Sequence, residues 1–288
     1  MGNCHNAKGI TMSNTFVNAP NLYVVASDGV KYAYRKIVKQ GTTPLVFLQH
    51  FTGTMDAWDP KVVDALAQGR TVIVFDNAGV GASAGKTPDT VEQMTIDAEN
   101  FILALGIGEV DLMGFSLGGF IAQLMATRKR VPVRKLVSAG SAPQGGEEHL
   151  MQVVTDAFSK NAPDVRLPLF FTPSVNSQAE GRAFLARAAV RTNERDPESG
   201  EDISNAQAKA IIGWCADKTT GNAVLKDISQ PTLIVHGSSD TMFPAVNAYE
   251  MFKNMTDGTL IIYPDSGHGA LFQYADTFAS HVELFLAA

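Results

Sequence analysis

Short apolar runs that alternate with helix-like segments are the feature of this sequence that most restricts its fold. Seven such runs are rich in β-branched and aliphatic residues: "NLYVVAS", "PLVFLQH", "TVIVFD", "EVDLMGF", "VRKLVSAG", "PTLIVHG" and "GTLIIYP". Between them, residues 90–105 and 117–129 have the apolar spacing of helices. Strands that are apolar along their whole length suit a parallel sheet buried on both faces. The pattern predicts an α/β fold with right-handed crossovers.

One long interval interrupts this alternation. After "VRKLVSAGSAP" the next strand-like run begins at Pro231, and the residues between them have helical patterns without strands. A structureless loop of that length would be unusual, so we interpret it as an inserted helical cap. Helices that only thicken the body of the protein are the alternative. The predicted domains are a flexible tail at residues 1–15, a core formed by residues 16–143 and 227–288, and the cap at residues 144–226.

Composition and charge exclude several classes of partner. The chain has 288 residues and a net charge of −6, which gives no electrostatic footprint for nucleic acid or an anionic membrane. A small-molecule substrate is therefore the expected partner. No apolar run approaches the length of about eighteen residues that suggests a membrane span, and the first residues lack a signal-peptide core, which predicts a cytoplasmic protein. Cys4 and Cys215 suggest neither a disulfide framework nor a zinc site.

A serine between glycines follows the fourth of the strand-like runs. Gly114 and Gly118 bracket Ser116 in "GFSLGG", which comes after "EVDLMGF" and opens a helix-like segment. A nucleophile on a sharp turn from strand to helix takes a strained backbone, and glycines leave room for that turn. The turn places the hydroxyl at the edge of the sheet where ligands bind in α/β folds. We predict that Ser116 is a nucleophile; a glycine-rich packing turn is the alternative.

A serine nucleophile needs a base, and the base needs an orienting carboxylate. His268 lies in the glycine-flanked loop "SGHG" just after the last strand-like run and is the candidate base. Asp240 follows the preceding run, and the order Ser, Asp, His is the one this strand-turn-helix architecture uses. Asp265 is nearer to His268 in sequence but is predicted to form a turn. Four other histidines are expected to be structural or solvated: His5, His149, His236 and His281. The sixth, His50, ends a strand and is expected to line the site.

Two backbone N–H groups are expected to stabilise an oxyanion. One belongs to Leu117, the residue after the nucleophile, and the other to Phe51 or Thr52 in the loop after "PLVFLQH". Side chains around these positions and aromatic residues of the cap are candidates for an apolar substrate pocket, although ordinary packing explains each of them equally well. The candidate pocket residues are His50, Thr52, Phe115, Phe170, Phe171 and Trp214.

These motifs together resemble the α/β-hydrolase superfamily, over nearly all of residues 22–288. The resemblance rests on "HFTG", "FDNAGVGAS", "GFSLGG", Asp240 after its strand, and "SGHG". It implies an eight-stranded, mostly parallel sheet with a helical cap after the sixth strand, a Ser116–Asp240–His268 triad, and no metal or organic cofactor. Many relatives have His-Gly before the oxyanion residue, whereas His50 here is followed directly by Phe51, so the choice between Phe51 and Thr52 stays open.

The sequence favours hydrolysis of a carboxylic ester, lactone or thioester through an acyl-enzyme. Cofactor-free haloperoxidases (perhydrolases) and carbon–carbon bond hydrolases share the same triad and remain alternatives, whereas Ser116 argues against dehalogenases, which use an aspartate. A ligand-binding protein with vestigial catalysis is an alternative from another class. "GVGASA" at 79–84 resembles a dinucleotide fingerprint, but the turn formers "GKTPDT" follow it instead of a helix, which argues against nucleotide binding.

Overall fold

The computed structural model describes residues 15–146, 150–159, 162–219 and 222–288. Its strands form one eight-stranded sheet in the order β1-β2-β4-β3-β5-β6-β7-β8. The strands are β1 (Leu22–Val25), β2 (Lys31–Ile37), β3 (Leu45–Leu48), β4 (Val72–Phe75), β5 (Val110–Phe115), β6 (Val133–Ala139), β7 (Thr232–Gly237) and β8 (Gly258–Tyr263). Strand β2 is antiparallel to β1 and β4, and all other pairs are parallel. The predicted α/β fold is confirmed.

Burial explains which strands the sequence pattern revealed. Every residue of β3, β4, β5 and β7 is buried. Because successive side chains point to opposite faces of a sheet, helices must cover both faces there. Each of the seven predicted runs contains one of the strands. The pattern missed β2, whose sequence "KYAYRKI" mixes charged and apolar residues although its Arg35 is fully buried.

Helices flank the sheet. They are α1 (Pro60–Ala67), α2 (Val91–Ala104), α3 (Leu117–Arg128), α4 (Leu150–Ser159), α5 (Arg166–Phe170), α6 (Val175–Ala188), α7 (Glu201–Ala216), α8 (Ala223–Asp227), α9 (Val246–Asn254), α10 (Ala270–Gln273) and α11 (Ala275–Ala287). Helix α1 packs against α11, and α2 packs against α3. The segments predicted as helices at 90–105 and 117–129 correspond to α2 and α3. Among the described residues, no helix is long and apolar enough to cross a membrane.

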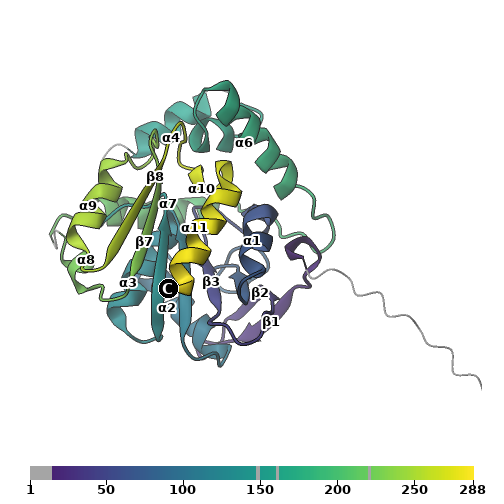
Figure 1. Cartoon of the computed structure of the whole chain (residues 1–288). Helices are drawn as coiled ribbons and strands as arrows, with labels where there is room; N and C mark the ends of the chain where they lie inside the picture. Colours follow the sequence, from purple (N-terminus) through teal and green to yellow (C-terminus); the bar gives the residue numbers. More distant parts are fainter. Residues whose placement is uncertain (1–14, 147–149, 160–161, 220–221) are drawn as a thin grey trace, which may run out of the picture.

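The insertion after the sixth strand is helical. Within the described part of the chain, α4 to α8 and no strand lie between β6 and β7, which confirms a helical cap at that point of the fold. Figure 1 shows α4 and α6 beyond one end of the sheet, and α6 packs against α10 and α1. The domain boundaries themselves stay a prediction, and all but one residue of the predicted tail 1–15 lies outside the described residues.

A buried ionic cluster joins the middle of the insertion, between α6 and α7, to the core. Arg35 on β2 contacts Asp56 at 2.6 Å and Asp196 at 3.3 Å, with both carboxylates and the guanidinium buried. The main-chain N–H of Asp196 also donates to Asp56 at 2.7 Å. Arg191 approaches the same carboxylate of Asp56 at 3.9 Å. Because unpaired charges are costly to bury, this cluster fixes the segment after α6 against the core.

Candidate active site

Ser116 occupies a strained turn between β5 and α3. Its backbone has φ 55° and ψ −118°, a combination that L-residues rarely adopt. The main chain holds the turn, since the Ser116 N–H donates to Ala139 O at 3.0 Å and its carbonyl accepts from the Ser141 hydroxyl at 3.0 Å. A side chain at Gly118 would overlap the main-chain oxygen of Leu48. The glycine of the motif therefore lets α3 approach β3 closely.

Asp240 and His268 are hydrogen bonded. Nδ1 of His268 lies 2.9 Å from Oδ2 of Asp240, and both side chains are buried. Oδ1 of Asp240 accepts from the main-chain N–H groups of Met242 at 2.9 Å and Phe243 at 3.0 Å. Because a carboxylate accepts, Nδ1 of His268 carries a proton and Nε2 is left as the basic nitrogen. Burial alone would raise the pKa of Asp240, but the charge and hydrogen bond of His268, together with those of His236, hold it well below its usual range.

The end of β6 brings Ser116 and His268 into one neighbourhood. Ser116 is hydrogen bonded to Ala139, and a Cβ built on the next residue, Gly140, would lie 3.3 Å from Nδ1 of His268. The ring of Phe115, which precedes the serine, has its centroid 5.0 Å from that of His268. Residues predicted from three separate segments of the sequence therefore meet at one edge of the sheet, as the parallel topology requires.

His236 is a neighbour of this pair that the sequence reasoning missed. It lies near the end of β7, and its Nε2 is 3.3 Å from Oδ2 of Asp240 and 2.6 Å from the carbonyl oxygen of Phe243. We expected it to be structural or solvated, because the strand around it is apolar throughout. Its place near the end of β7, four residues before Asp240 in the loop that follows this strand, was the available signal.

The turn after β3 distinguishes Phe51 from Thr52. The N–H of Gly53 donates to His50 O at 3.0 Å, and Thr52 has a positive φ of 55°. The N–H of Thr52 donates to Oε1 of Gln207, on α7, at 2.6 Å. That N–H is therefore occupied, and the N–H of Phe51 is the remaining candidate in this turn. Gln207 was not among the predicted residues, and nothing in the local sequence identifies it.

Aromatic side chains of the insertion reach His268. Phe170, the last residue of α5, has its ring centroid 5.6 Å from that of His268 and 5.6 Å from that of Phe115. The ring of His50 is 5.9 Å from Phe170 and 5.2 Å from Phe115. The N–H of Gly269 donates to Phe170 O at 2.9 Å. Three of the six candidate pocket residues thus pack together, and two of them, Phe115 and Phe170, contact His268.

The side chains of the other two aromatic candidates make different contacts. Phe171 packs against Phe184 within the insertion, with ring centroids 6.0 Å apart. Trp214 on α7 stacks on Phe120 of α3 at 5.2 Å. Both are buried, and these contacts join helices to one another or to the core. Thr52, the remaining candidate, has its hydroxyl bonded to Phe51 O at 2.8 Å.

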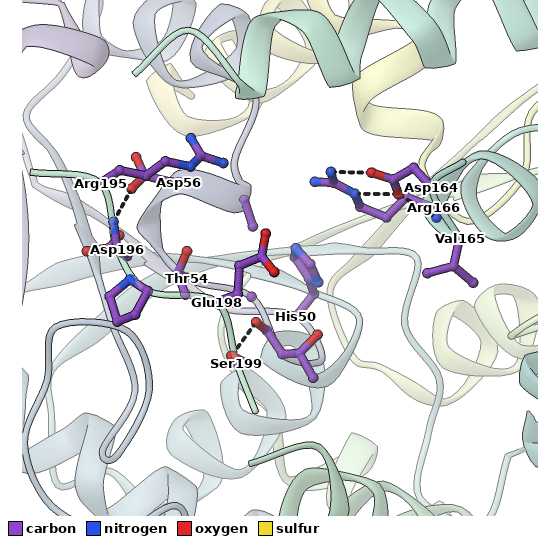
Figure 2. A pocket seen from close by; sticks show the side chains of 14 residues that line it. His50, Thr54, Asp56, Asp164, Val165, Arg166, Arg195, Asp196, Glu198 and Ser199 are labelled. Carbon is purple, nitrogen blue, oxygen red and sulfur yellow. Dashed lines mark hydrogen bonds and ion pairs between the residues drawn. The ribbon is translucent and has the colours of Figure 1, made fainter. Parts of the chain in front are cut away.

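A cavity of about 270 Å³ lies beside the turn after β3. His50, Thr52, the start of α5 and the segment 195–199 line it, and Figure 2 shows many of these side chains. Its walls are mainly polar. A second cavity, of about 840 Å³, is mainly apolar, and Leu167, Leu169, Phe171 and Gly267 are among the residues that line it. Among the described residues, no group of three or more His, Cys, Asp or Glu side chains is arranged to hold a metal ion.

Comparison with known proteins shows the family of this chain. A model of the α/β-hydrolase fold matches residues 43–274, which is more than half of the sequence. The chain therefore belongs to the α/β-hydrolase fold family, in agreement with the resemblance seen in its motifs.

Individual relatives differ in the reactions named for them. The chain is 27% identical to a non-heme chloroperoxidase of Burkholderia pyrrocinia over 92% of this chain and 99% of that protein. It is also 27% identical to a pimeloyl-[acyl-carrier protein] methyl ester esterase of Nitrosomonas europaea, over 82% and 92% respectively. Among solved structures, an α/β-hydrolase fold protein of Chitinophaga pinensis shares 40% identity with a TM-score of 0.91, over 96% of this chain and 100% of that one.

Proposed function

We propose that this protein is a serine hydrolase that cleaves a carboxylic ester, lactone or thioester of a small to medium, largely apolar substrate. The observation that carries the proposal is the buried hydrogen bond of 2.9 Å between His268 and Asp240, at the sheet edge that also holds the strained Ser116. The esterase named among the relatives supports the same reaction class.

In this proposal Ser116 attacks the substrate carbonyl carbon. His268 Nε2 takes the serine proton as the Oγ–carbon bond forms, and Asp240 stabilises the resulting imidazolium. The N–H groups of Leu117 and Phe51 stabilise the negative oxygen, and the N-terminus of α3 favours that charge. The imidazolium then protonates the departing alcohol or thiol. Water, deprotonated by His268, attacks the acyl-enzyme and releases the acid.

The first test compares wild type with Ser116→Ala on p-nitrophenyl esters of short, medium and long acids at matched protein concentration. We expect the variant to lose a factor of about 10³ or more in kcat/KM. The chain-length profile of the wild type measures how large an acyl group the site accepts. Equal or undetectable activity in the two proteins would argue against hydrolysis of these esters by Ser116 and favour a narrow non-ester substrate or a ligand-binding role.

Perhydrolysis is a second candidate, because a non-heme chloroperoxidase is among the relatives. Hydrogen peroxide would replace water in the attack on the acyl-enzyme, giving a peracid that oxidises halide and is itself reduced to the acid. Bromination of monochlorodimedone in acetate buffer with peroxide tests this reaction. Activity that depends on acetate, peroxide and Ser116 would support it, and activity without acetate would reject this route.

A further inference from the structure

His50 has a buried ring nitrogen with no hydrogen-bond partner among the described residues. Its Nδ1 lies 2.9 Å from the main-chain oxygen of Phe51. A carbonyl oxygen can only accept, so Nδ1 carries the proton and Nε2 presents a lone pair. Nε2 is buried and has no partner among the described residues, in a residue that is 6% exposed overall. A buried acceptor is costly to leave without a donor, so this atom indicates a missing ligand group.

The imidazole of His50 is neutral at physiological pH. Burial, followed by the positive charge of Arg166, lowers the pKa of His50 to about 3. Nε2 therefore does not become a donor near neutral pH, and the ring does not attract an anion by its own charge. A group that binds to this atom must bring a proton of its own, as a hydroxyl does.

The ring borders the polar cavity described above. Figure 2 shows the side chains of His50, Arg166 and Glu198 directed toward the same open space. Nε and Nη2 of Arg166 are paired with Asp164 at 2.9 and 2.6 Å, and Nη1 takes no part in that pair. Arg166 thus offers a donor and Glu198 an acceptor beside the lone pair of His50. The volume of about 270 Å³ is close to the lower end of ligand pockets, roughly 300 Å³.

This cavity adjoins the proposed reaction centre. His50 directly precedes Phe51, and its ring lies 5.2 Å from that of Phe115, the residue before Ser116. On the basis of the proposed hydrolase function, we propose that His50 is a specificity-determining residue and that the natural substrate carries a hydroxyl group that donates to its Nε2. Arg166 and Glu198 contact further polar atoms of the same substituent. The substrate is then apolar at one end and hydroxylated at the other.

The test uses pairs of esters that differ by a hydroxyl in place of a methyl group. Methyl 2-hydroxybutyrate is paired with methyl 2-methylbutyrate, methyl 3-hydroxybutyrate with methyl 3-methylbutyrate, and 2-hydroxyethyl butyrate with propyl butyrate. We expect at least one hydroxylated ester to exceed its partner in kcat/KM by about tenfold or more. His50→Phe keeps a ring but removes the acceptor, and should bring that ratio close to one. His50→Gln keeps a side-chain oxygen and should retain part of the preference.

A ratio near one for every pair in the wild type, or a ratio unchanged in His50→Phe, overturns the inference. Hydrolysis that is lost in Ser116→Ala leaves the proposed function standing in either case, so the two claims fail separately. If His50→Phe does not fold, a second measurement replaces the comparison of activities. It records the imidazole ¹⁵N resonances of His50 by NMR in Ser116→Ala, which should bind the ester without hydrolysing it. The Nε2 resonance should then shift with the preferred hydroxylated ester and not with its methyl partner, and an equal response to both rejects the hydrogen bond.

Discussion

His236 and His268 contact the same oxygen of Asp240, at 3.3 and 2.9 Å. Nε2 of His236 also lies 2.6 Å from the carbonyl oxygen of Phe243. Both neighbours are acceptors, so Nε2 carries the proton and donates to them. Burial alone would lower the pKa of His236, but the hydrogen bond and charge of Asp240 outweigh burial and raise it. The carboxylate is thus held by a second histidine, from the strand β7 that precedes it.

Replacing His236 should therefore impair His268 indirectly. We expect His236→Phe to lower kcat by about 10-fold to 100-fold, the value of one hydrogen bond to a charged group. KM should change little, because His236 acts through Asp240 and not on substrate. His236→Gln, which keeps a donor, should recover part of the loss. His281, which pairs with the Tyr263 hydroxyl at 2.8 Å, supplies the matched control, and a similar kcat loss in His281→Phe would contradict a specific role.

Gln207 should control the geometry of the proposed oxyanion turn. Its Oε1 accepts the Thr52 N–H at 2.6 Å, and the side chain is fully buried. Gln207→Met removes the acceptor at similar volume, so we expect kcat to fall about tenfold because the Phe51 N–H is less well oriented. Gln207→Glu keeps an acceptor and should lose less. Equal kcat in Gln207→Met and wild type would show that the turn holds its conformation unaided.

Asp265 should couple the insertion to the histidine loop. Its carboxylate accepts from the hydroxyls of Thr172 at 2.7 Å and Ser174 at 2.6 Å. We expect Asp265→Ala to raise KM by about three- to tenfold, because the segment that carries Phe170 is then less firmly placed over His268. The double variant Thr172→Val/Ser174→Ala should have the same effect. Combining all three changes should add little, since they remove one set of contacts; full additivity would argue against the coupling.

The buried carboxylate of Asp196 should make stability depend on pH. Burial raises the pKa of Asp196, the positive charge of Arg35 lowers it, and the negative charge of Asp56 raises it. The result is a pKa of about 6, compared with 3.8 for the unperturbed group. At pH values between these two pKa values, Asp196 binds more protons in the folded state than in the unfolded state. Stability from this group is therefore present at low pH and is lost as pH rises through that window.

Urea unfolding of wild type and Asp196→Asn at pH 4.5 and 7 measures this effect. Subtracting the stability of the variant from that of wild type removes the contributions of groups that do not interact with Asp196, and the difference then reports Asp196 together with its partner Asp56. We expect this difference to become less favourable to wild type by about 2 kcal/mol as pH rises. A difference that stays constant would mean that Asp196 ionises alike in both states.

Gly118 should tolerate no side chain. Its added Cβ would overlap the carbonyl oxygen of Leu48, whereas a Cβ at Gly213 on α7 would meet nothing within 4 Å. We expect Gly118→Ala to cost about 3 kcal/mol of stability through overpacking. Gly213→Ala should instead stabilise the protein by about 0.5–1 kcal/mol, as alanine does in a helix. Thermal unfolding of both variants checks the contrast, and a stable Gly118→Ala protein would show that α3 can move away from β3.

The sequence by itself determined the α/β fold and the candidate nucleophile, because both are written in local patterns. The apolar runs predicted buried strands, and the glycines around Ser116 predicted a turn from strand to helix. Strand β2 escaped this reasoning because its charged residues interrupt the apolar run. Its Arg35 is buried by ion pairing with Asp56 and Asp196, a partnership between distant parts of the chain.

Only the tertiary structure decided how distant residues act on the site. The proposal of Phe51 and not Thr52 as the second oxyanion donor rests on Gln207, which binds the Thr52 N–H from 155 residues away in the chain. The unpaired lone pair of His50 depends on which groups surround it after folding, and so does the polar character of the cavity beside it. Hydrogen bonding and burial are properties of the packed chain, so neither can be read from residue type or local periodicity.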